Sequence, residues 1–213
     1  TGLTLTGGIV DDGGGGILFR SADTLTLVDT VVTGNVAANG GGIYSEYEGN
    51  LVLQSSTISG NTAESSKGGG IHAVDGDVSL TDSTISGNFA YGGGGGIFSQ
   101  YAGNINVTNS QITNNEVTEA GYHGGGIYGG NGDVTLTGST VSGNESKGDG
   151  GGLYSYKGSV AISNTTITGN KADYGGGGVP DADDHEIRVY KLNSDTGIFD
   201  QIFQANEPNA YTI

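Results

Sequence analysis

The sequence predicts an all-β fold, a right-handed, single-stranded parallel β-helix of about six to seven coils. Glycine clusters recur every 26 to 30 residues, an asparagine recurs with nearly the same period, and the intervening residues alternate between apolar and polar types. Residues 1–179 are assigned to the solenoid. Residues 180–213 are assigned to a C-terminal hairpin or cap, or to the start of a next domain.

Two landmarks define the repeat. The apolar residue after each glycine cluster recurs at intervals of 26, 28, 26, 30, 26 and 26, at Ile17, Ile43, Ile71, Ile97, Ile127, Leu153 and Val179. The asparagine that closes each repeat recurs at intervals of 26, 27, 27, 29 and 26, at Asn35, Asn61, Asn88, Asn115, Asn144 and Asn170. Because the two series agree, the repeat is not a chance pattern.

Each period contains three predicted strands, which in one coil cover residues 43–45, 51–54 and 57–59. Apolar and polar residues alternate along them, as in half-buried strands, and no helical spacing persists. The asparagine column is expected at a corner of each coil. There, asparagine tolerates left-handed backbone angles, and stacked carboxamides can bond from coil to coil. Length varies mostly between the asparagine and the next glycine cluster, which predicts one variable loop per coil.

Composition excludes several classes of protein. Glycine accounts for 44 of 213 residues, but it lies in clusters instead of at every third residue, which excludes collagen. Regularly spaced Ile, Leu and Val exclude a disordered tract. Seven Lys and Arg against 23 Asp and Glu give a net charge of −16, which disfavours binding to nucleic acids and to anionic membranes. No apolar run approaches the roughly 20 residues of a membrane span, so no direct membrane insertion is expected.

Both ends of the repeat carry expectations. Residues 4–8 match 57–61, so further coils or another domain are expected before Thr1, because an uncapped coil leaves an open edge. The repeat stops at Pro180, and residues 193–197 resemble the turn of a hairpin. The acidic residues after Pro180 offer oxygen ligands for a possible Ca²⁺, with a solvated acidic turn as the alternative: Asp181, Asp183 and Asp184. No other cofactor is expected.

Two short motifs resemble those of polymorphic outer-membrane proteins and related bacterial surface β-helices. Gly41-Gly42-Ile43 resembles the Gly-Gly-Ala-Ile motif of that family without its Ala, and residues 58–61 resemble its Phe-x-x-Asn motif with Ile in place of Phe. The resemblance covers roughly residues 1–179. It implies a β-helix on the bacterial cell surface or in a secreted protein, similar to autotransporter passengers, adhesins and polysaccharide-active proteins.

The residue after each apolar landmark should point outward. These positions, with two tyrosines three residues further along, form a predicted external aromatic stripe: Leu18, Tyr44, Tyr47, His72, Phe98, Tyr101, Tyr128 and Tyr154. Aromatic rings beside bare glycine backbone suit stacking on sugar rings or on a partner protein. The alternative is that these side chains only stabilise neighbouring strands as cross-strand pairs.

Catalysis receives no support from the sequence. The few basic residues do not gather on one strand row, as a polysaccharide lyase of this fold would need, and no pair of outward carboxylates suggests a glycoside hydrolase. Rows of Thr and Ser, such as Thr57 with Ser59 and Thr166 with Thr168, resemble ice-binding surfaces, although Val31 and Gln111 interrupt them.

The function expected from the sequence is therefore that of a non-enzymatic, extracellular β-helix segment of a larger bacterial surface or secreted protein. It would bind carbohydrate or protein through a repeated surface. A polysaccharide-active enzyme is the alternative, and ice binding is a minor one.

Overall fold

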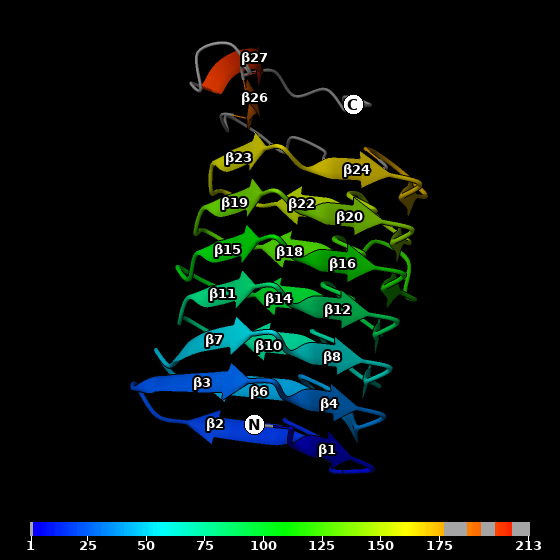
Figure 1. Cartoon of the computed structure of the whole chain (residues 1–213). Coiled ribbons are helices and arrows are strands. Elements are labelled where there is room, and N and C mark those ends of the chain that lie inside the picture. Colours follow the sequence, from blue (N-terminus) through cyan, green and yellow to red (C-terminus); the bar gives the residue numbers. More distant parts are fainter. Residues whose placement is uncertain (1, 177–186, 193–198, 206–213) are drawn as a thin grey trace.

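The computed structural model describes residues 2–176, 187–192 and 199–205, and these form a β-solenoid of about six turns with no helix (Figure 1). Each turn runs through four short strands. Strands at the same place in successive turns pair in parallel and build four sheets along the solenoid axis. The predicted fold class is confirmed.

The four sheets are numbered by the order in which the chain visits them after a glycine cluster. The first contains β2 (Ile17–Arg20), β6 (Ile43–Glu46), β10 (Ile71–Ala73), β14 (Ile97–Ser99), β18 (Ile127–Gly129) and β22 (Leu153–Ser155). The second contains β3 (Thr24–Val28), β7 (Asn50–Gln54), β11 (Val78–Thr81), β15 (Ile105–Thr108), β19 (Val134–Thr137), β23 (Val160–Ser163), β26 (Ile187–Leu192) and β27 (Phe199–Ala205). The third contains β1 (Thr4–Thr6), β4 (Val31–Thr33), β8 (Thr57–Ser59), β12 (Thr84–Ser86), β16 (Gln111–Thr113), β20 (Thr140–Ser142) and β24 (Thr166–Thr168). The fourth contains β5 (Val36–Ala37), β9 (Thr62–Ala63), β13 (Phe89–Ala90), β17 (Glu116–Val117), β21 (Glu145–Ser146) and β25 (Lys171–Ala172).

The fourth sheet corrects the sequence prediction of three strands per coil. Its strands have two residues each, which is too short for an alternating pattern to be recognised in the sequence. They follow the asparagine directly and lead into the loops of variable length. The loops therefore start from a paired strand rather than from a free corner.

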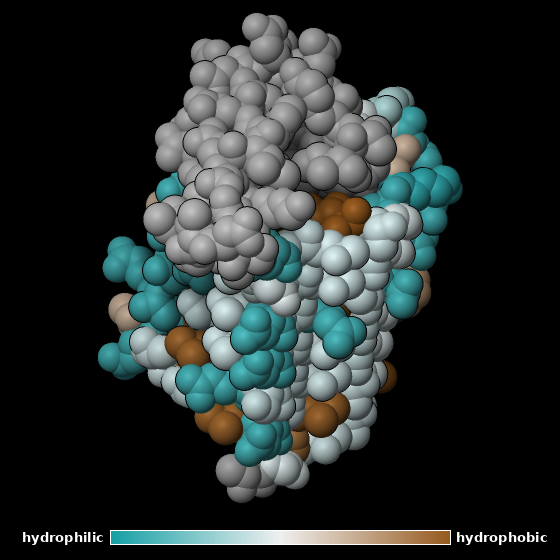
Figure 2. Space-filling model, turned by 45° about the horizontal axis from the view of Figure 1, so that its top comes forward, coloured by the Kyte–Doolittle hydropathy of each residue, from teal (hydrophilic) through white to brown (hydrophobic). Residues whose placement is uncertain are grey.

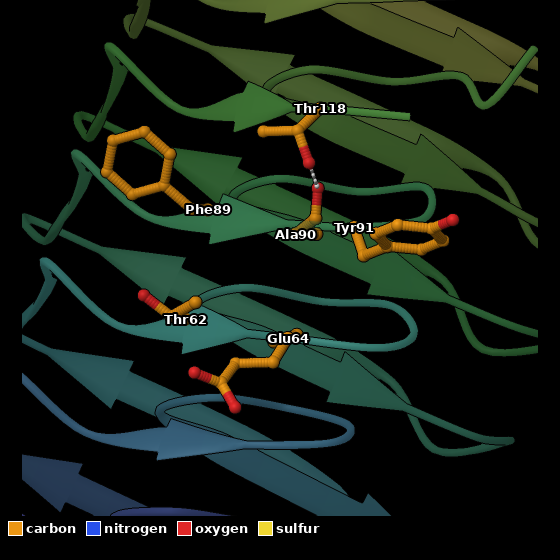
Figure 3. Close-up of a pocket in the computed structure, with 7 residues that line it drawn as sticks. Thr62, Glu64, Phe89, Ala90, Tyr91 and Thr118 are labelled. Atoms are coloured by element: carbon orange, nitrogen blue, oxygen red, sulfur yellow. Dashed lines mark hydrogen bonds between the residues drawn. The ribbon is translucent and has the colours of Figure 1, made fainter. Parts of the chain in front are cut away.

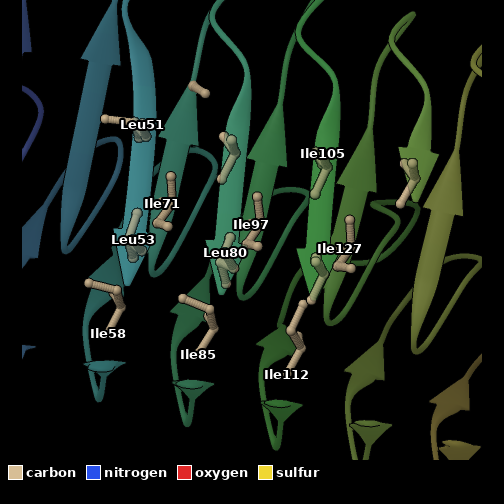
Figure 4. Packing of buried hydrophobic residues seen from close by; sticks show 14 of the residues in the cluster. Leu51, Leu53, Ile58, Ile71, Leu80, Ile85, Ile97, Ile105, Ile112 and Ile127 are labelled. Atoms are coloured by element: carbon tan, nitrogen blue, oxygen red, sulfur yellow. The ribbon is translucent and has the colours of Figure 1, made fainter. Parts of the chain in front are cut away.

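The hydrophobic core is a set of stacked rows, one for each inward strand position (Figure 4). In one coil, Ile43, Leu51, Leu53 and Ile58 are completely buried, and the same positions of the next coils continue the rows. Register is maintained without slip, so Ile71 lies over Ile43 and under Ile97. Burial of each such side chain contributes about 1.5–3 kcal/mol, and the rows make that contribution continuous along the axis.

The asparagine column forms a buried hydrogen-bonded ladder. Oδ1 of Asn88 accepts from the backbone N–H and from Nδ2 of Asn61, each at 3.0 Å. Nδ2 of Asn88 donates to the carbonyl of Ile58 at 3.0 Å and to Oδ1 of Asn115 at 2.9 Å. The same bonds join the other members of the column, so the carboxamides run as one chain of hydrogen bonds through the solenoid. Each buried amide group is thereby paired, as a buried polar group requires.

The ladder asparagines are not themselves in the left-handed backbone region, contrary to the sequence prediction. The preceding residue has the positive φ, as in Gly60 at 60° and Gly143 at 65°. In the copy written Asn-Asn, Asn114 has a φ of 55° and Asn115 joins the ladder. In this copy, Asn114 therefore forms the left-handed turn and Asn115 forms the hydrogen bonds of the ladder.

The glycine clusters are explained by contact with this ladder. A Cβ on Gly42 would lie 2.6 Å from the carbonyl oxygen of Gly70 in the next coil and 3.0 Å from Nδ2 of Asn61. Gly70, Gly96 and Gly126 meet Asn88, Asn115 and Asn144 in the same way. Each coil thus closes where its last cluster glycine packs against its own asparagine, and no side chain fits between them.

Two further ladders support the other corners. Between the second and third sheets, the backbone N–H of Ser56 donates to Oγ of Ser83 at 3.1 Å, and that of Ser83 donates to Oγ of Ser110 at 3.0 Å. Before the second sheet, the N–H of Asn104 donates to Oδ1 of Asp77 at 2.7 Å, and that of Asp133 donates to Oδ1 of Asn104 at 2.9 Å. Side-chain oxygens therefore cap backbone donors at three corners of the coil.

At the C-terminal end, β26 extends the second sheet in parallel with β23, and β27 pairs antiparallel with β26. The turn that joins these two strands, the predicted domain boundary near residue 180 and the Ca²⁺ candidates Asp181, Asp183 and Asp184 all lie outside the described residues.

We predict that Asn88→Ala lowers the free energy of unfolding by about 3 kcal/mol, because it leaves buried backbone groups of Asn61 and Ile58 without partners. Asn106→Ala is the matched control, since Asn106 is exposed on β15 and should change stability by less than about 0.5 kcal/mol. Urea denaturation of both variants measures the difference, and equal midpoints would show that the ladder does not stabilise the fold.

Candidate functional site

The predicted aromatic stripe exists as a continuous row of rings on the first sheet. Centroids of neighbouring rings are 5.0 Å apart for Tyr44 and His72, 5.1 Å for His72 and Phe98, 4.5 Å for Phe98 and Tyr128, and 5.3 Å for Tyr128 and Tyr154. These rings point away from the main core, and parallel pairing at the same register brings them together.

Most of this row is covered, which corrects the prediction of an external stripe. His72 and Phe98 are each 3% exposed and Tyr154 is 7% exposed, whereas Tyr44 and Tyr128 are half-buried. The variable loops fold back over the first sheet and cause this burial. The ammonium of Lys67 lies 4.7 Å from the Phe98 ring centroid, and the His123 ring stacks on Tyr154 with centroids 4.5 Å apart. The rings thus pack largely beneath the loops, whereas Leu18, at the same position of the first coil, is 40% exposed.

Tyr47 and Tyr101 are exposed, at 56% and 47%, but they lie on the turn after the first sheet, away from these loops. The Thr and Ser rows of the third sheet bond partly to one another, as in the 3.2 Å hydrogen bond from Ser59 Oγ to Thr33 Oγ1. In the ranges that the structure describes, no three His, Asp or Glu side chains are placed to hold a metal ion.

Two recesses open among the loops. The first, called here the aromatic cleft, has a volume of about 490 Å³ (Figure 3). Its lining residues come from three successive coils: Thr62, Ala63, Glu64, Phe89, Ala90, Tyr91 and Thr118. Phe89 and Tyr91 are 41% and 43% exposed and flank the buried Ala90. Two rings, a carboxylate and hydroxyl groups therefore line one hollow, with the Phe89 and Tyr91 rings directed to opposite sides of Ala90 (Figure 3).

Strand alternation explains this arrangement. Ala90 points into the core at 1% exposure, so its neighbours Phe89 and Tyr91 both point outward from β13 and the residue that follows it. A hydrogen bond with the Glu119 carboxylate raises the pKa of Tyr91, so its phenol stays protonated at neutral pH. The Thr118 hydroxyl donates to the carbonyl of Ala90 at 3.3 Å and ties the neighbouring coil to the floor of the cleft.

Phe89 and Tyr91 are not among the residues predicted from the sequence to bind a ligand, although the sequence carries a signal for them. When the coils are aligned on their ladder asparagines, the outward positions of the fourth sheet hold Val36, Thr62, Glu116, Glu145 and Lys171 in the other coils. An aromatic residue on each side of the inward Ala is found only in this coil among the described ones. The glycine landmark places this region in the predicted variable loop, where no alternating pattern draws attention to the two rings.

The second recess, called here the lysine recess, has a volume of about 240 Å³. It is lined by Lys67, Gly93, Phe98, Gly121, Tyr122, His123 and Tyr128. Where Gly93 and Gly121 line the recess, its wall is bare backbone. Tyr122 is 40% exposed. Burial raises the pKa of Tyr128 to about 12, so this phenol remains a hydrogen-bond donor.

The protonation of His123 follows from its contacts. The backbone N–H of Asp149 donates to His123 Nδ1 at 2.9 Å, so the proton of the neutral ring is on Nε2. Burial lowers the pKa of His123, and this outweighs the opposing effect of the Asp149 carboxylate, whose Oδ2 lies 3.2 Å from Nδ1. At neutral pH, His123 is therefore an uncharged donor through Nε2.

These features define a β-solenoid protein. Its parallel sheets are stacked along one axis, polar ladders occupy three corners of each coil, and the loops that differ in length lie between the fourth and the first sheet. The chain belongs to the family described as right handed beta helix region, whose model matches residues 15–191. No curated protein and no solved structure matches the chain. Among the described residues, no helix is long and apolar enough to cross a membrane.

His72 provides a test of the buried row. Its Nε2 lies 3.0 Å from Oε1 of Gln100, its Nδ1 is buried without a partner, and burial lowers its pKa to about 4. The nearby Lys67 ammonium acts in the same direction. Between pH 6.5 and about 4, His72 is protonated in the unfolded chain but stays neutral in the folded chain. The free energy of unfolding therefore falls as the pH falls.

We predict that wild type loses on the order of 3 kcal/mol more than His72→Phe when the pH falls from 7 to 4, because Phe cannot take up a proton. Urea denaturation of both proteins at several pH values measures the difference. Titration of the carboxylates affects both proteins equally and therefore cancels in the comparison. Parallel pH profiles would show that His72 is not buried in its neutral form.

Proposed function

We propose that this chain is a non-catalytic, extracellular β-helix domain of a bacterial surface or secreted protein that binds carbohydrate through the aromatic cleft. The observation that supports this most is the pair of exposed rings, Phe89 and Tyr91, held on a rigid strand above a shared hollow. Aromatic faces pack against the C–H faces of sugar rings, and nearby polar groups bond to sugar hydroxyls. Glu64, Thr62 and Thr118 supply such groups.

The dimensions and setting of the cleft support a saccharide ligand. Its volume of about 490 Å³ falls within the usual range of small-molecule sites. Its floor is β-sheet backbone of β9 and β13, so little conformational entropy is lost when a ligand binds. On the face of the solenoid shown in Figure 2, exposed apolar side chains are scattered among polar ones.

Binding without turnover is the better supported of the two activities expected for this fold. Glycoside hydrolysis uses two carboxyl groups across the scissile bond. The residues that line the cleft include one, Glu64, and the Glu119 carboxylate is hydrogen-bonded to Tyr91. Weak binding of this kind would gain strength from several domains on one surface, as in adhesion.

We predict that Tyr91→Ala weakens binding of neutral oligosaccharides by about tenfold, because loss of a stacking ring removes about 1.4 kcal/mol. Tyr101→Ala is the matched control, since Tyr101 is similarly exposed but lies outside the cleft. A screen against immobilised neutral glycans followed by calorimetry with the best of them measures both variants.

Absence of binding to any neutral glycan, or equal losses in the two variants, would refute the proposal. Release of new reducing ends from a bound glycan would instead establish the enzymatic alternative.

A further inference from the structure

We propose that the lysine recess binds an anionic group, carboxylate or sulfate, carried by an acidic glycan. The polar side chains that line it can each donate a hydrogen bond to a ligand: the Lys67 ammonium, the imidazole N–H of His123 and the phenols of Tyr122 and Tyr128. None of the lining residues is a carboxylate. A set of donors around a small hollow is the complement of an oxyanion.

Lys67 differs from Arg20, Lys147 and Lys171 in having no carboxylate partner among the described residues, and it differs from Lys157, which also lies over a ring, in lining a recess. Arg20, Lys147 and Lys171 are paired with carboxylates, through Glu46 for the first and Glu145 for the other two. Lys67 forms no ion pair within the described part of the chain and lies instead over Phe98, inside the recess. The buried ring holds the ammonium in place while one side of it faces the hollow, so its charge is available to a ligand.

The nearby acidic groups are engaged elsewhere. Oδ1 of Asp149 accepts a hydrogen bond from the backbone N–H of Gly175 at 2.6 Å, and its Oδ2 lies beside His123 Nδ1. The Glu119 carboxylate is hydrogen-bonded to the phenol of Tyr91. In a chain with a net charge of −16, the recess is therefore a local site where donors outnumber acceptors. Such local complementarity gives selectivity even where the overall charge is unfavourable.

The recess and the aromatic cleft belong to one binding face. They share no lining residue, but the segments that line the cleft, 62–64, 89–91 and 118, lead within a few residues to Lys67, Gly93 and residues 121–123 of the recess. The N–H of Gly92 donates to the carbonyl of Ser66 between them. The recess, at about 240 Å³, suits one substituted ring, and the larger cleft suits its neighbour in the same chain. The assignment to a glycan rests on the proposed function, whereas binding of the anionic group depends on the recess alone.

The test uses four probes on the whole protein: glucose, glucuronate, glucose 6-sulfate and a neutral oligosaccharide. Titrations are followed by the backbone amide signals of Gly93 and Gly121, which line the recess. We expect at least one anionic monosaccharide to bind about tenfold more tightly than glucose and to shift these signals. The glucuronate and sulfate arms decide which anionic group is preferred.

Lys67→Met should reduce binding of the anionic monosaccharide at least tenfold and leave binding of the neutral oligosaccharide unchanged. Lys157→Met is the matched control, because Lys157 also lies over an aromatic ring, 5.3 Å from the Tyr156 centroid, but outside the recess. Lys67→Arg keeps the positive charge and should retain binding of the anionic monosaccharide. If it does, loss of binding in Lys67→Met comes from loss of the charge and not from a failure to fold.

The inference is overturned if neither anion shifts the recess signals, or if Lys67→Met and Lys157→Met bind it equally. If the neutral oligosaccharide does not bind but an anionic monosaccharide does, the proposed function is overturned and the anion site is retained.

Discussion

The fold depends on in-register stacking of successive coils about 4.8 Å apart, and the asparagine ladder is the interaction that most restricts it. A carboxamide can bond to the coil before and the coil after only if every coil places the same group at the same point, as Asn61, Asn88 and Asn115 do. The last glycine of each cluster must then remain without a side chain, because Asn and neighbouring backbone occupy that space. Two motifs almost twenty residues apart are therefore one structural unit.

This restriction determines where the molecule can vary. An inserted residue in a paired strand would shift every inward side chain to the outer face, so differences in length collect between the fourth sheet and the next glycine cluster. Those loops then cover the aromatic row of the first sheet, and gaps between them become the two recesses. The strands of the fourth sheet supply most of the aromatic cleft, and the loops supply most of the lysine recess.

The charge distribution follows the same division. Carboxylates give the chain its net charge of −16, and most described basic side chains are neutralised beside them. Lys67 and Lys157 lie over aromatic rings instead, and of these two only Lys67 lines one of the two recesses. Long-range repulsion of an anionic ligand is weakened by salt within a Debye length of about 8 Å, whereas short hydrogen bonds in a recess are screened much less.

The sequence alone determined the class of fold, the spacing of the coils and the inward residues, because periodic local patterns encode them directly. It also located the asparagine column, although the left-handed turn lies one residue earlier, at Gly60 and its equivalents. Only the tertiary structure decided that His72, Phe98 and Tyr154 are covered and that Phe89 and Tyr91 share a hollow. Outward direction is a property of one strand, whereas exposure depends on how loops from other coils fold over it, and no local pattern carries that information.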